Sequence, residues 1–230
     1  MNSALKALTT LASSSVVAMA LASESNAATM VQMFDYDIPE TATPFPEPFD
    51  FTLPGFDSAL GMLTGITIQT TVNSTGIVSI FNATGTNQDF INATSAVTLT
   101  VTAPTTTINT TATAIEPSGT VIPGQNDFPG QMGTQVSNTI IEPGDFGAYI
   151  GGMLNLSFMA NALAGSYSGT APSGVFFGGS ANVGGNVAII YTYEVEDNVP
   201  GNPPRTPEPG TIAGLLAIGA TGLASRRRKS

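Results

Sequence analysis

The chain has 230 residues, a formal net charge of −10 at pH 7 and no His, Cys or Trp. These absences exclude disulfide bonds, thiolate nucleophiles, thiolate metal sites and every catalytic arrangement that needs a histidine base. Residues 28–204 contain fourteen Asp and Glu but no Lys or Arg, so we expect this part of the chain to repel nucleic acid, anionic lipid and acidic polysaccharide unless a divalent cation bridges them.

The first 27 residues predict a secretory signal peptide. One cation, Lys6, precedes a mostly apolar run at residues 8–22, and small residues follow it. Ser25 and Ala27 suit the recognition positions of signal peptidase, so we expect cleavage between Ala27 and Ala28. The remaining chain would then work outside the cytoplasm without disulfides and would depend on its core alone.

Residues 39–54 contain five prolines and are expected to form an irregular loop. Directly after it, residues 56–66 read Phe-Asp-Ser-Ala-Leu-Gly-Met-Leu-Thr-Gly-Ile. This run resembles the Phe-Asp-Pro-x-Leu-Gly-Thr-Leu motif of choice-of-anchor E domains, with Ser58 in place of Pro and Met62 in place of Thr. The resemblance implies a secreted β domain displayed at the cell surface and implies no catalytic residues.

The motif residues are Phe56, Asp57, Leu60, Gly61 and Leu63. Their chemistry also has a simple packing interpretation. Phe56, Leu60 and Leu63 would place apolar groups on one side of a turn that Gly61 permits.

Residues 28–199 are expected to form one all-β domain, an antiparallel β-sandwich of jelly-roll or immunoglobulin-like type. Apolar and polar residues alternate strictly in several short runs, which is typical of half-buried strands. The expected strands cover residues 66–72, 78–80, 97–103, 154–158 and 187–195. Turns between them are expected at residues 73–76, 123–124, 129–130, 143–144, 178–179 and 184–185, and long glycine-rich loops within residues 144–185.

Three kinds of site are compatible with the acidic and aromatic residues of this domain. Paired carboxylates for glycoside hydrolysis would come from Asp35 with Asp37, or from Glu194 with Glu196 and Asp197. The second group would also offer oxygen ligands to calcium, but no calcium-binding motif accompanies it, and a solvated acidic rim is the better explanation. Sugar stacking would need exposed aromatic rings, but alternation places Tyr191 and Tyr193 on an apolar face that is expected to be core.

The C-terminal end predicts a membrane anchor. Residues 200–209 form a proline-rich spacer, and residues 210–230 are expected to be a transmembrane helix with a basic cytoplasmic tail. The uncharged run 211–225 would span roughly 22 Å as a helix, against roughly 30 Å of hydrocarbon, and arginine side chains can bridge part of the difference. The positive-inside rule keeps the basic tail in the cytoplasm and the acidic domain outside.

Pro207, Glu208 and Pro209, then a short apolar segment, then Arg226, Arg227 and Arg228 follow one another at the C-terminus. This order resembles the PEP-CTERM sorting signal of Gram-negative exopolysaccharide producers. The resemblance implies that an exosortase-like membrane protease recognises the Pro-Glu-Pro element, that the arginines stop the segment in the membrane, and that the tail is then removed.

These observations predict an exported, non-enzymatic protein of the cell surface or extracellular matrix, associated with exopolysaccharide or biofilm. Its partners would be signal peptidase, an exosortase-like protease during transient membrane insertion, and exopolysaccharide. No cofactor is expected, and calcium is the one ion for which the acidic residues offer ligands. The alternative is a carbohydrate-binding module for a neutral or calcium-bridged glycan.

Overall fold

A computed structural model of the chain describes residues 14–15, 27–151 and 155–196. Strands dominate these residues, and the only helices among them are two short 3-10 helices, η1 (Ser58–Leu60) and η2 (Pro143–Tyr149). The strands are β1 (Ser14–Ser15), β2 (Ala27–Ala42), β3 (Phe49–Pro54), β4 (Met62–Asn82), β5 (Gln88–Thr102), β6 (Thr107–Val121), β7 (Gly124–Ile140), β8 (Asn155–Ala162), β9 (Ser166–Thr170) and β10 (Val175–Glu196). The chain divides into two compact units, Met1–Val195 and Glu196–Ser230, and the sheets described below lie in the first.

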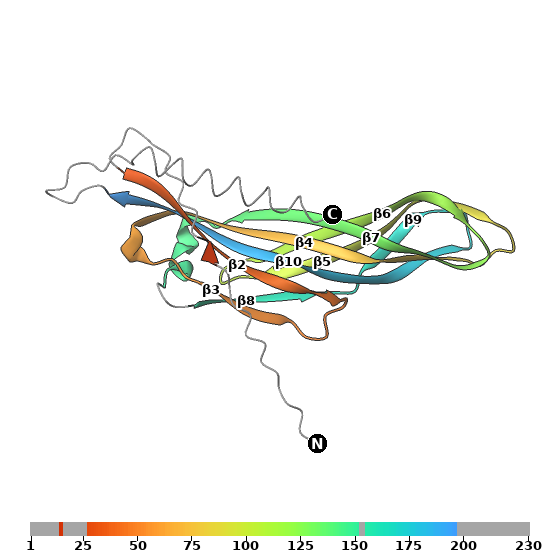
Figure 1. Cartoon of the computed structure of the whole chain (residues 1–230), viewed down its shortest axis with the longest axis horizontal. Coiled ribbons are helices and arrows are strands. Elements are labelled where there is room, and N and C mark those ends of the chain that lie inside the picture. The colour runs from red at the N-terminus through yellow and green to blue at the C-terminus, as the bar shows by residue number, and fades with distance from the viewer. Residues whose placement is uncertain (1–13, 16–26, 152–154, 197–230) are drawn as a thin grey trace, which may run out of the picture. The chain divides into compact units, whose positions relative to one another are not determined.

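The strands form two sheets (Figure 1). The first has the order β1-β2-β10-β4-β7, and the second has the order β3-β8-β5-β6 with β9 also paired to β5. Within them, β4 is antiparallel to both β10 and β7, and β5 is antiparallel to β6, β8 and β9. The prediction of an all-β antiparallel fold is therefore confirmed.

The helices expected at the ends, over residues 1–27 and 210–230, lie outside the described residues, apart from Ser14–Ser15, which form β1, and Ala27, which begins β2. Within the part of the chain that is described, no helix has the length and apolar character to cross a membrane.

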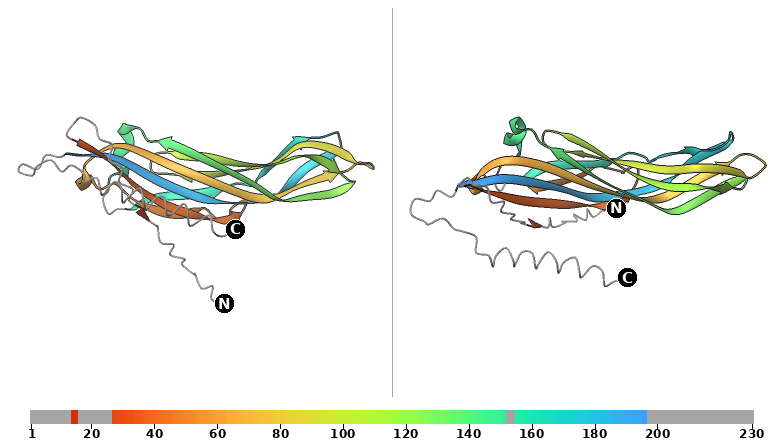
Figure 2. Two further views of the ribbon diagram at one scale, coloured as in Figure 1. Left: turned by 45° about the horizontal axis from the view of Figure 1, so that its top comes forward. Right: turned by 90° about the horizontal axis from the view of Figure 1, so that it is seen from above.

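The strand pairs are nested around one hairpin. β5 and β6 form this hairpin through residues 103–106, and Ala103 N–H donates to the Thr106 carbonyl across the turn at 2.8 Å. Outside it, β4 pairs with β7, β3 with β8, and β2 with β10. These nested pairs form one long antiparallel two-stranded ribbon. The ribbon folds back on itself, so that β10 pairs with β4 and β8 pairs with β5. Two further views show the long strands twisting along their length (Figure 2).

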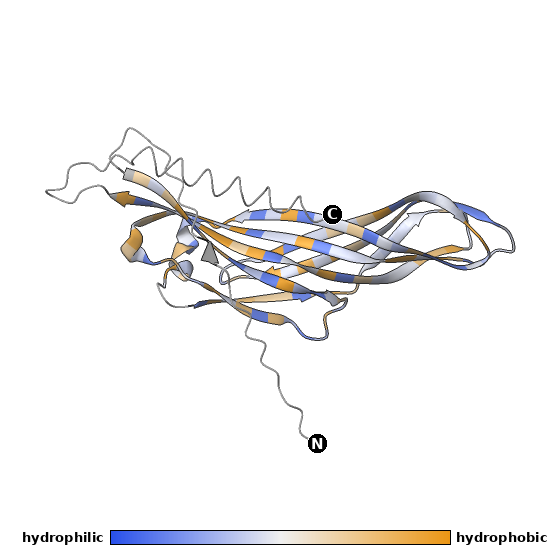
Figure 3. Ribbon diagram, in the orientation of Figure 1, coloured by the Kyte–Doolittle hydropathy of each residue, from blue (hydrophilic) through white to orange (hydrophobic). Residues whose placement is uncertain are grey.

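Alternation along the strands produces the core. In β5, Val97, Leu99 and Val101 are fully buried while the threonines between them face outward, and apolar and polar segments alternate along the ribbon (Figure 3). Most buried residues form one main cluster, to which Tyr191 and Tyr193 belong as expected. A second, smaller cluster is built from Val78, Ile80, Phe90, Ala93 and Val121.

Several expected turns lie inside long strands. Residues 73–76 continue β4, and residues 178–179 and 184–185 continue β10, because these two strands pair over almost their whole length, with Asn73 opposite Gly184. Residues 129–130 lie in β7 beside a register shift between Gly76 and Ile77 of β4. Only residues 123–124, at the junction of β6 and β7, were assigned correctly as a turn between strands; residues 143–144 begin η2.

The loop expected over residues 39–54 is shorter than predicted, since β2 runs to Ala42 and β3 begins at Phe49. Pro39 is part of β2, but β1 pairs only with Met33 and Phe34 of that strand. The missing N–H of Pro39 therefore removes no hydrogen bond to β1. The glycine-rich region 144–185 likewise contains β8, β9 and the start of β10.

Candidate functional site

A shallow polar groove lies on the outer face of the first sheet, over β2, β10 and β4. Its volume is about 330 Å³, near the lower end of the range for small-molecule sites. Gly184 and Gly185 of β10 form the floor, where neither residue has a side chain. The walls come from β2 and β4 and from the next outward residue of β10, namely Asp37, Ile38, Glu40, Asn73, Thr75 and Asn186.

Hydrogen bonds from neutral donors fix the acidic side chains of this groove. Asn186 Nδ2 donates to Asp35 Oδ2 at 3.1 Å and to Asp37 Oδ1 at 2.9 Å. Across the floor, the Thr75 hydroxyl donates to the Glu40 carboxylate. The carboxylates of β2 are therefore held by side chains of β10 and β4, and the groove depends on the pairing of these three strands.

Within the described residues, the groove carries negative charge without a cation to balance it, because they contain no Lys or Arg. Carboxylates accept hydrogen bonds, whereas amides and hydroxyls both donate and accept. A ligand that presents hydroxyl groups and no negative charge fits this set of side chains best.

Asp35 and Asp37, the first predicted carboxylate pair, lie together as expected. They stand two residues apart on β2, so both side chains point to the same face of the strand. Both accept from the same amide of Asn186, each at about 3 Å. This shared hydrogen bond supports a structural role, since it ties β2 to β10.

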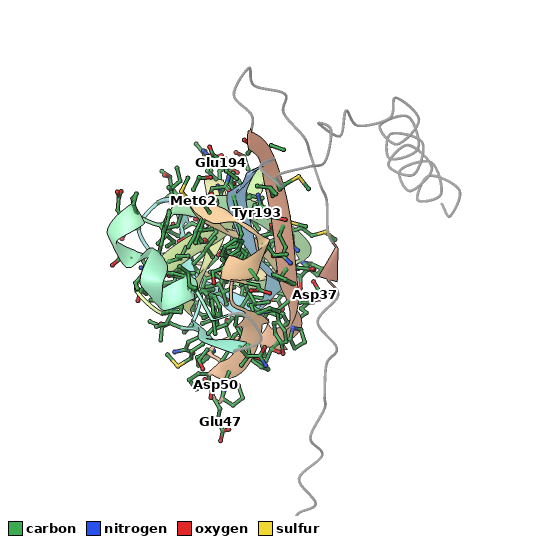
Figure 4. The ribbon with its side chains drawn as sticks, turned by 90° about the vertical axis from the view of Figure 1, so that its left-hand side faces the viewer. Asp37, Glu47, Asp50, Met62, Tyr193 and Glu194 are labelled. Atoms are coloured by element: carbon green, nitrogen blue, oxygen red, sulfur yellow. The ribbon has the colours of Figure 1, made fainter. Side chains whose placement is uncertain are left out.

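The second predicted group of carboxylates is described only in part, with Glu194 as its one described side chain. Glu194 lies opposite Met62 in the β10–β4 ladder, Glu196 is the last residue of β10, and Asp197 lies outside the described residues. Figure 4 shows Glu194 and Met62 at one corner of the ribbon and Asp37 at another. Over the described ranges, no three acidic side chains are arranged to hold a metal ion, so the structure offers no candidate calcium site there.

The motif that resembles choice-of-anchor E domains leads into β4. Phe56 is fully buried, and its ring lies 5.6 Å from that of Tyr191 and 5.2 Å from that of Tyr193. Its backbone N–H donates to the Tyr149 carbonyl at 2.8 Å. Leu63 packs against the same core cluster from the partly buried start of β4. These two residues anchor the segment in the core.

The other motif residues shape the turn. Asp57 caps η1 by accepting a hydrogen bond from the Ala59 N–H at 2.9 Å. A Cβ at Gly61 would lie 2.2 Å from the Glu194 carbonyl oxygen, so glycine is needed beside β10. Leu60 is 38% exposed and does not share the buried side of Phe56 and Leu63, which corrects that part of the packing interpretation.

Ala27 and Ala28, the residues beside the expected signal-peptidase cut, are the first two residues of β2. The sorting-signal residues Pro207, Glu208, Pro209, Arg226, Arg227 and Arg228 lie outside the described residues.

Sequence reasoning missed the groove residues Glu40, Asn73, Thr75 and Asn186. Asn73 and Thr75 were assigned to a turn, and Gly184–Gly185 was assigned to another. Ile68 and Val72 point inward, so extending the same alternation beyond residue 72 would have placed Asn73 and Thr75 on the exposed face. No local signal showed that β2 would lie beside them.

No family model matches this chain, and no curated protein matches it either. Among solved structures, the chain is paired with the structure of infectious bursal disease virus Gt strain at 11% identity and a TM-score of 0.13, over 90% of this chain and 53% of that one. The chain thus spans about half the length of that protein, and a TM-score this low supports no inference about fold or function.

Proposed function

We propose that this protein is exported, processed at both ends and displayed, without enzymatic activity, at the surface or in the extracellular matrix of a Gram-negative-type bacterium. Signal peptidase would remove residues 1–27, and an exosortase-like membrane protease would recognise Pro207, Glu208 and Pro209. The product would associate with exopolysaccharide.

One observation carries this proposal: all six cations lie outside residues 28–204, at Lys6, Arg205 and residues 226–229. Cations at these places serve export and membrane orientation, which act on the ends of a precursor. The acidic domain between them suits a soluble component outside the cytoplasm. The described all-β fold is compatible with this role, although a fold by itself does not determine function.

We further propose that the domain is a jelly roll rather than an immunoglobulin-like sandwich. The supporting observation is the nesting of β4–β7, β3–β8 and β2–β10 around the β5–β6 hairpin, with four strands of each sheet taken from this ribbon. Jelly rolls build two such four-stranded sheets and include lectin domains. A carbohydrate-binding module for a neutral or calcium-bridged glycan is therefore the second candidate function, and the polar groove favours the neutral case.

Mass spectrometry of the protein from producing cells tests the sorting proposal. We expect a product that begins at Ala28 and lacks Arg226–Lys229, and we expect Glu208→Ala to retain the tail. The chain offers a matched control, because Pro46-Glu47-Pro48 repeats the tripeptide in the β2–β3 loop without an apolar segment after it. Glu47→Ala should be processed normally. A wild-type product that keeps its arginines, or equal processing of both variants, would contradict the proposal.

A further inference from the structure

Two phenylalanines are exposed side by side on the outer face of the first sheet. Phe81 of β4 and Phe176 of β10 are direct partners in the antiparallel ladder and are 50% and 60% exposed. Their neighbours Ile80 and Phe177 point inward to the smaller core cluster, so alternation forces these two rings outward. Single exposed apolar residues are ordinary, whereas two adjacent exposed rings form a contiguous apolar surface of the kind found at contact sites.

Polar side chains border these rings on β7. Gln125 is the ladder partner of Phe81, and Asp127 is the partner of Ser79, the next outward residue of β4. Ser79 Oγ donates to Asp127 Oδ1 at 2.6 Å, and Gln125 Nε2 donates to its two oxygens at 2.9 and 3.2 Å. These two donors lower the pKa of Asp127, which keeps the carboxylate charged and fixed beside the rings.

The surface next to the rings is open. Gly178 follows Phe176 on the outer face of β10 and lies opposite Ser79. A Cβ built at Gly178 would meet no atom within 4 Å. Two neighbouring rows of outward residues therefore cross β10, β4 and β7. The first row is Phe176, Phe81 and Gln125, and the second is Gly178, Ser79 and Asp127. Because Gly178 has no side chain, a flat space lies beside the rings and next to the hydrogen-bonding groups.

This combination matches the surface of a sugar. The C–H face of a pyranose packs on an aromatic ring, whose electron-rich face attracts it, while the hydroxyls around its edge need carboxylate and amide partners. Directly paired residues have Cα atoms about 5 Å apart, comparable to the length of one sugar unit. Two adjacent units of a chain would therefore reach both rings.

Charge decides between the possible occupants. An acidic glycan or an anionic membrane would be repelled, because residues 28–204 carry fourteen acidic residues and no Lys or Arg. A second copy of the chain would carry the same charge and would place Asp127 against its own symmetry-related patch. An uncharged glycan meets none of these penalties.

We propose that Phe81, Phe176, Gln125 and Asp127 form a binding site for a neutral polysaccharide, with sugar rings seated on the phenylalanines and hydroxyls donated to Asp127. The biological role of this site depends on the proposed association with exopolysaccharide. Binding itself is independent of how the ends of the chain are processed.

Affinity electrophoresis of the full chain tests the site, with laminarin, xyloglucan and galactomannan as neutral probes and alginate as the acidic probe, each with calcium and with EDTA. We expect at least one neutral probe to retard the protein equally in both buffers and alginate to have no effect. The double variant Phe81→Ala/Phe176→Ala should lose affinity about tenfold or more, and Asp127→Asn should weaken binding without changing the shape of the site.

Two control variants separate this site from others. Ile140→Ala removes an apolar side chain that is 76% exposed on the same face of β7, far from the rings, and should bind as the parent does. Asn186→Ala alters the polar groove and measures how much of the affinity belongs to that groove instead. Because both phenylalanines are exposed, the double variant should keep its circular dichroism spectrum and Tm.

Three results would overturn the proposal: no retardation by any neutral probe, undiminished affinity in the double variant, or loss in Asn186→Ala alone. Sedimentation of the parent as a dimer that the double variant abolishes would assign the patch to self-association instead. Each of these outcomes leaves the mass-spectrometric test of processing unaffected, so the two proposals fail separately.

Discussion

Tyr191 is a buried titratable residue that makes the stability of the fold depend on pH. Its ring is fully buried, and its hydroxyl donates to the Pro54 carbonyl at 3.0 Å, which joins β10 to β3 of the other sheet. Burial raises the pKa of Tyr191 well above its ordinary value, and the neighbouring Tyr149 adds to the shift. Because residues 28–204 contain no Lys, Arg, His or Cys, tyrosine is the only kind of side chain there that titrates in alkaline solution.

The raised pKa of Tyr191 predicts a loss of stability at alkaline pH. In the unfolded chain a tyrosine loses its proton near pH 10, whereas Tyr191 in the folded state keeps its proton. Up to about pH 10 this group therefore leaves the free energy of unfolding unchanged. Above that pH the free energy of unfolding falls by up to about 1.4 kcal/mol per pH unit for each such group. Tyr191→Phe should lose about 1 kcal/mol at pH 7 with its hydrogen bond but decline less steeply above pH 10. Urea titrations between pH 7 and 11 measure both effects, and an unchanged decline in the variant would contradict this account.

At the scale of elements, β10 shows why local turn signals failed. Gly178–Gly179 and Gly184–Gly185 are typical turn residues, yet β10 passes through both pairs without a break. At Gly179 the backbone has φ of +153°, and a Cβ there would lie 2.1 Å from the Ile77 carbonyl oxygen of β4. The glycine allows two long strands to approach closely, which only the partner strand reveals.

Adjacent glycines of β10 provide a matched stability test. Gly179→Ala should destabilise the fold by about 2 kcal/mol or more, because the new methyl group would collide with the backbone of β4 and strain φ. Gly178→Ala meets no atom within 4 Å and should be neutral or slightly stabilising. Urea denaturation followed by tyrosine fluorescence compares the two variants. Similar losses in both would show that the close approach at Gly179 is not what requires glycine.

Over the whole molecule, unbalanced negative charge is the dominant electrostatic feature. No ion pair can form within residues 28–204, since the acidic side chains there have no basic partners. Several acidic side chains in the described ranges instead accept hydrogen bonds from neutral groups, as Asp89 does from Thr120 at 2.6 Å and Glu116 from Gln131 at 2.7 Å. The folded state therefore concentrates like charges that the unfolded chain separates.

Screening of this repulsion should make the protein more stable in salt. The Debye length falls from about 30 Å at 0.01 M to about 3 Å at 1 M ionic strength, so we expect Tm to rise by roughly 2–4 °C, or about 1 kcal/mol, between these limits. Calcium and magnesium at equal ionic strength should act alike. A Tm that falls with sodium chloride would contradict the repulsion, and a rise specific to calcium would reveal an ion site.

The sequence by itself determined the class of fold and much of the core. Period-two alternation in residues 97–103 and 187–195 is local, and it correctly placed Val97, Leu99, Tyr191 and Tyr193 inside and the threonines outside. The absence of basic residues from 28–204 is likewise a property of the sequence alone, and it disfavours anionic ligands whatever the fold.

Only the tertiary structure decided which surfaces those strands build. The groove needs Asp37, Asn73 and Asn186 from three strands, and the aromatic patch needs Phe81 and Phe176, which are 95 residues apart in the chain. Strand pairing is a long-range choice of partner and register, and it overrode the turn signals at 73–76 and 178–179. A site made across neighbouring strands has no spacing in the sequence from which it could be predicted.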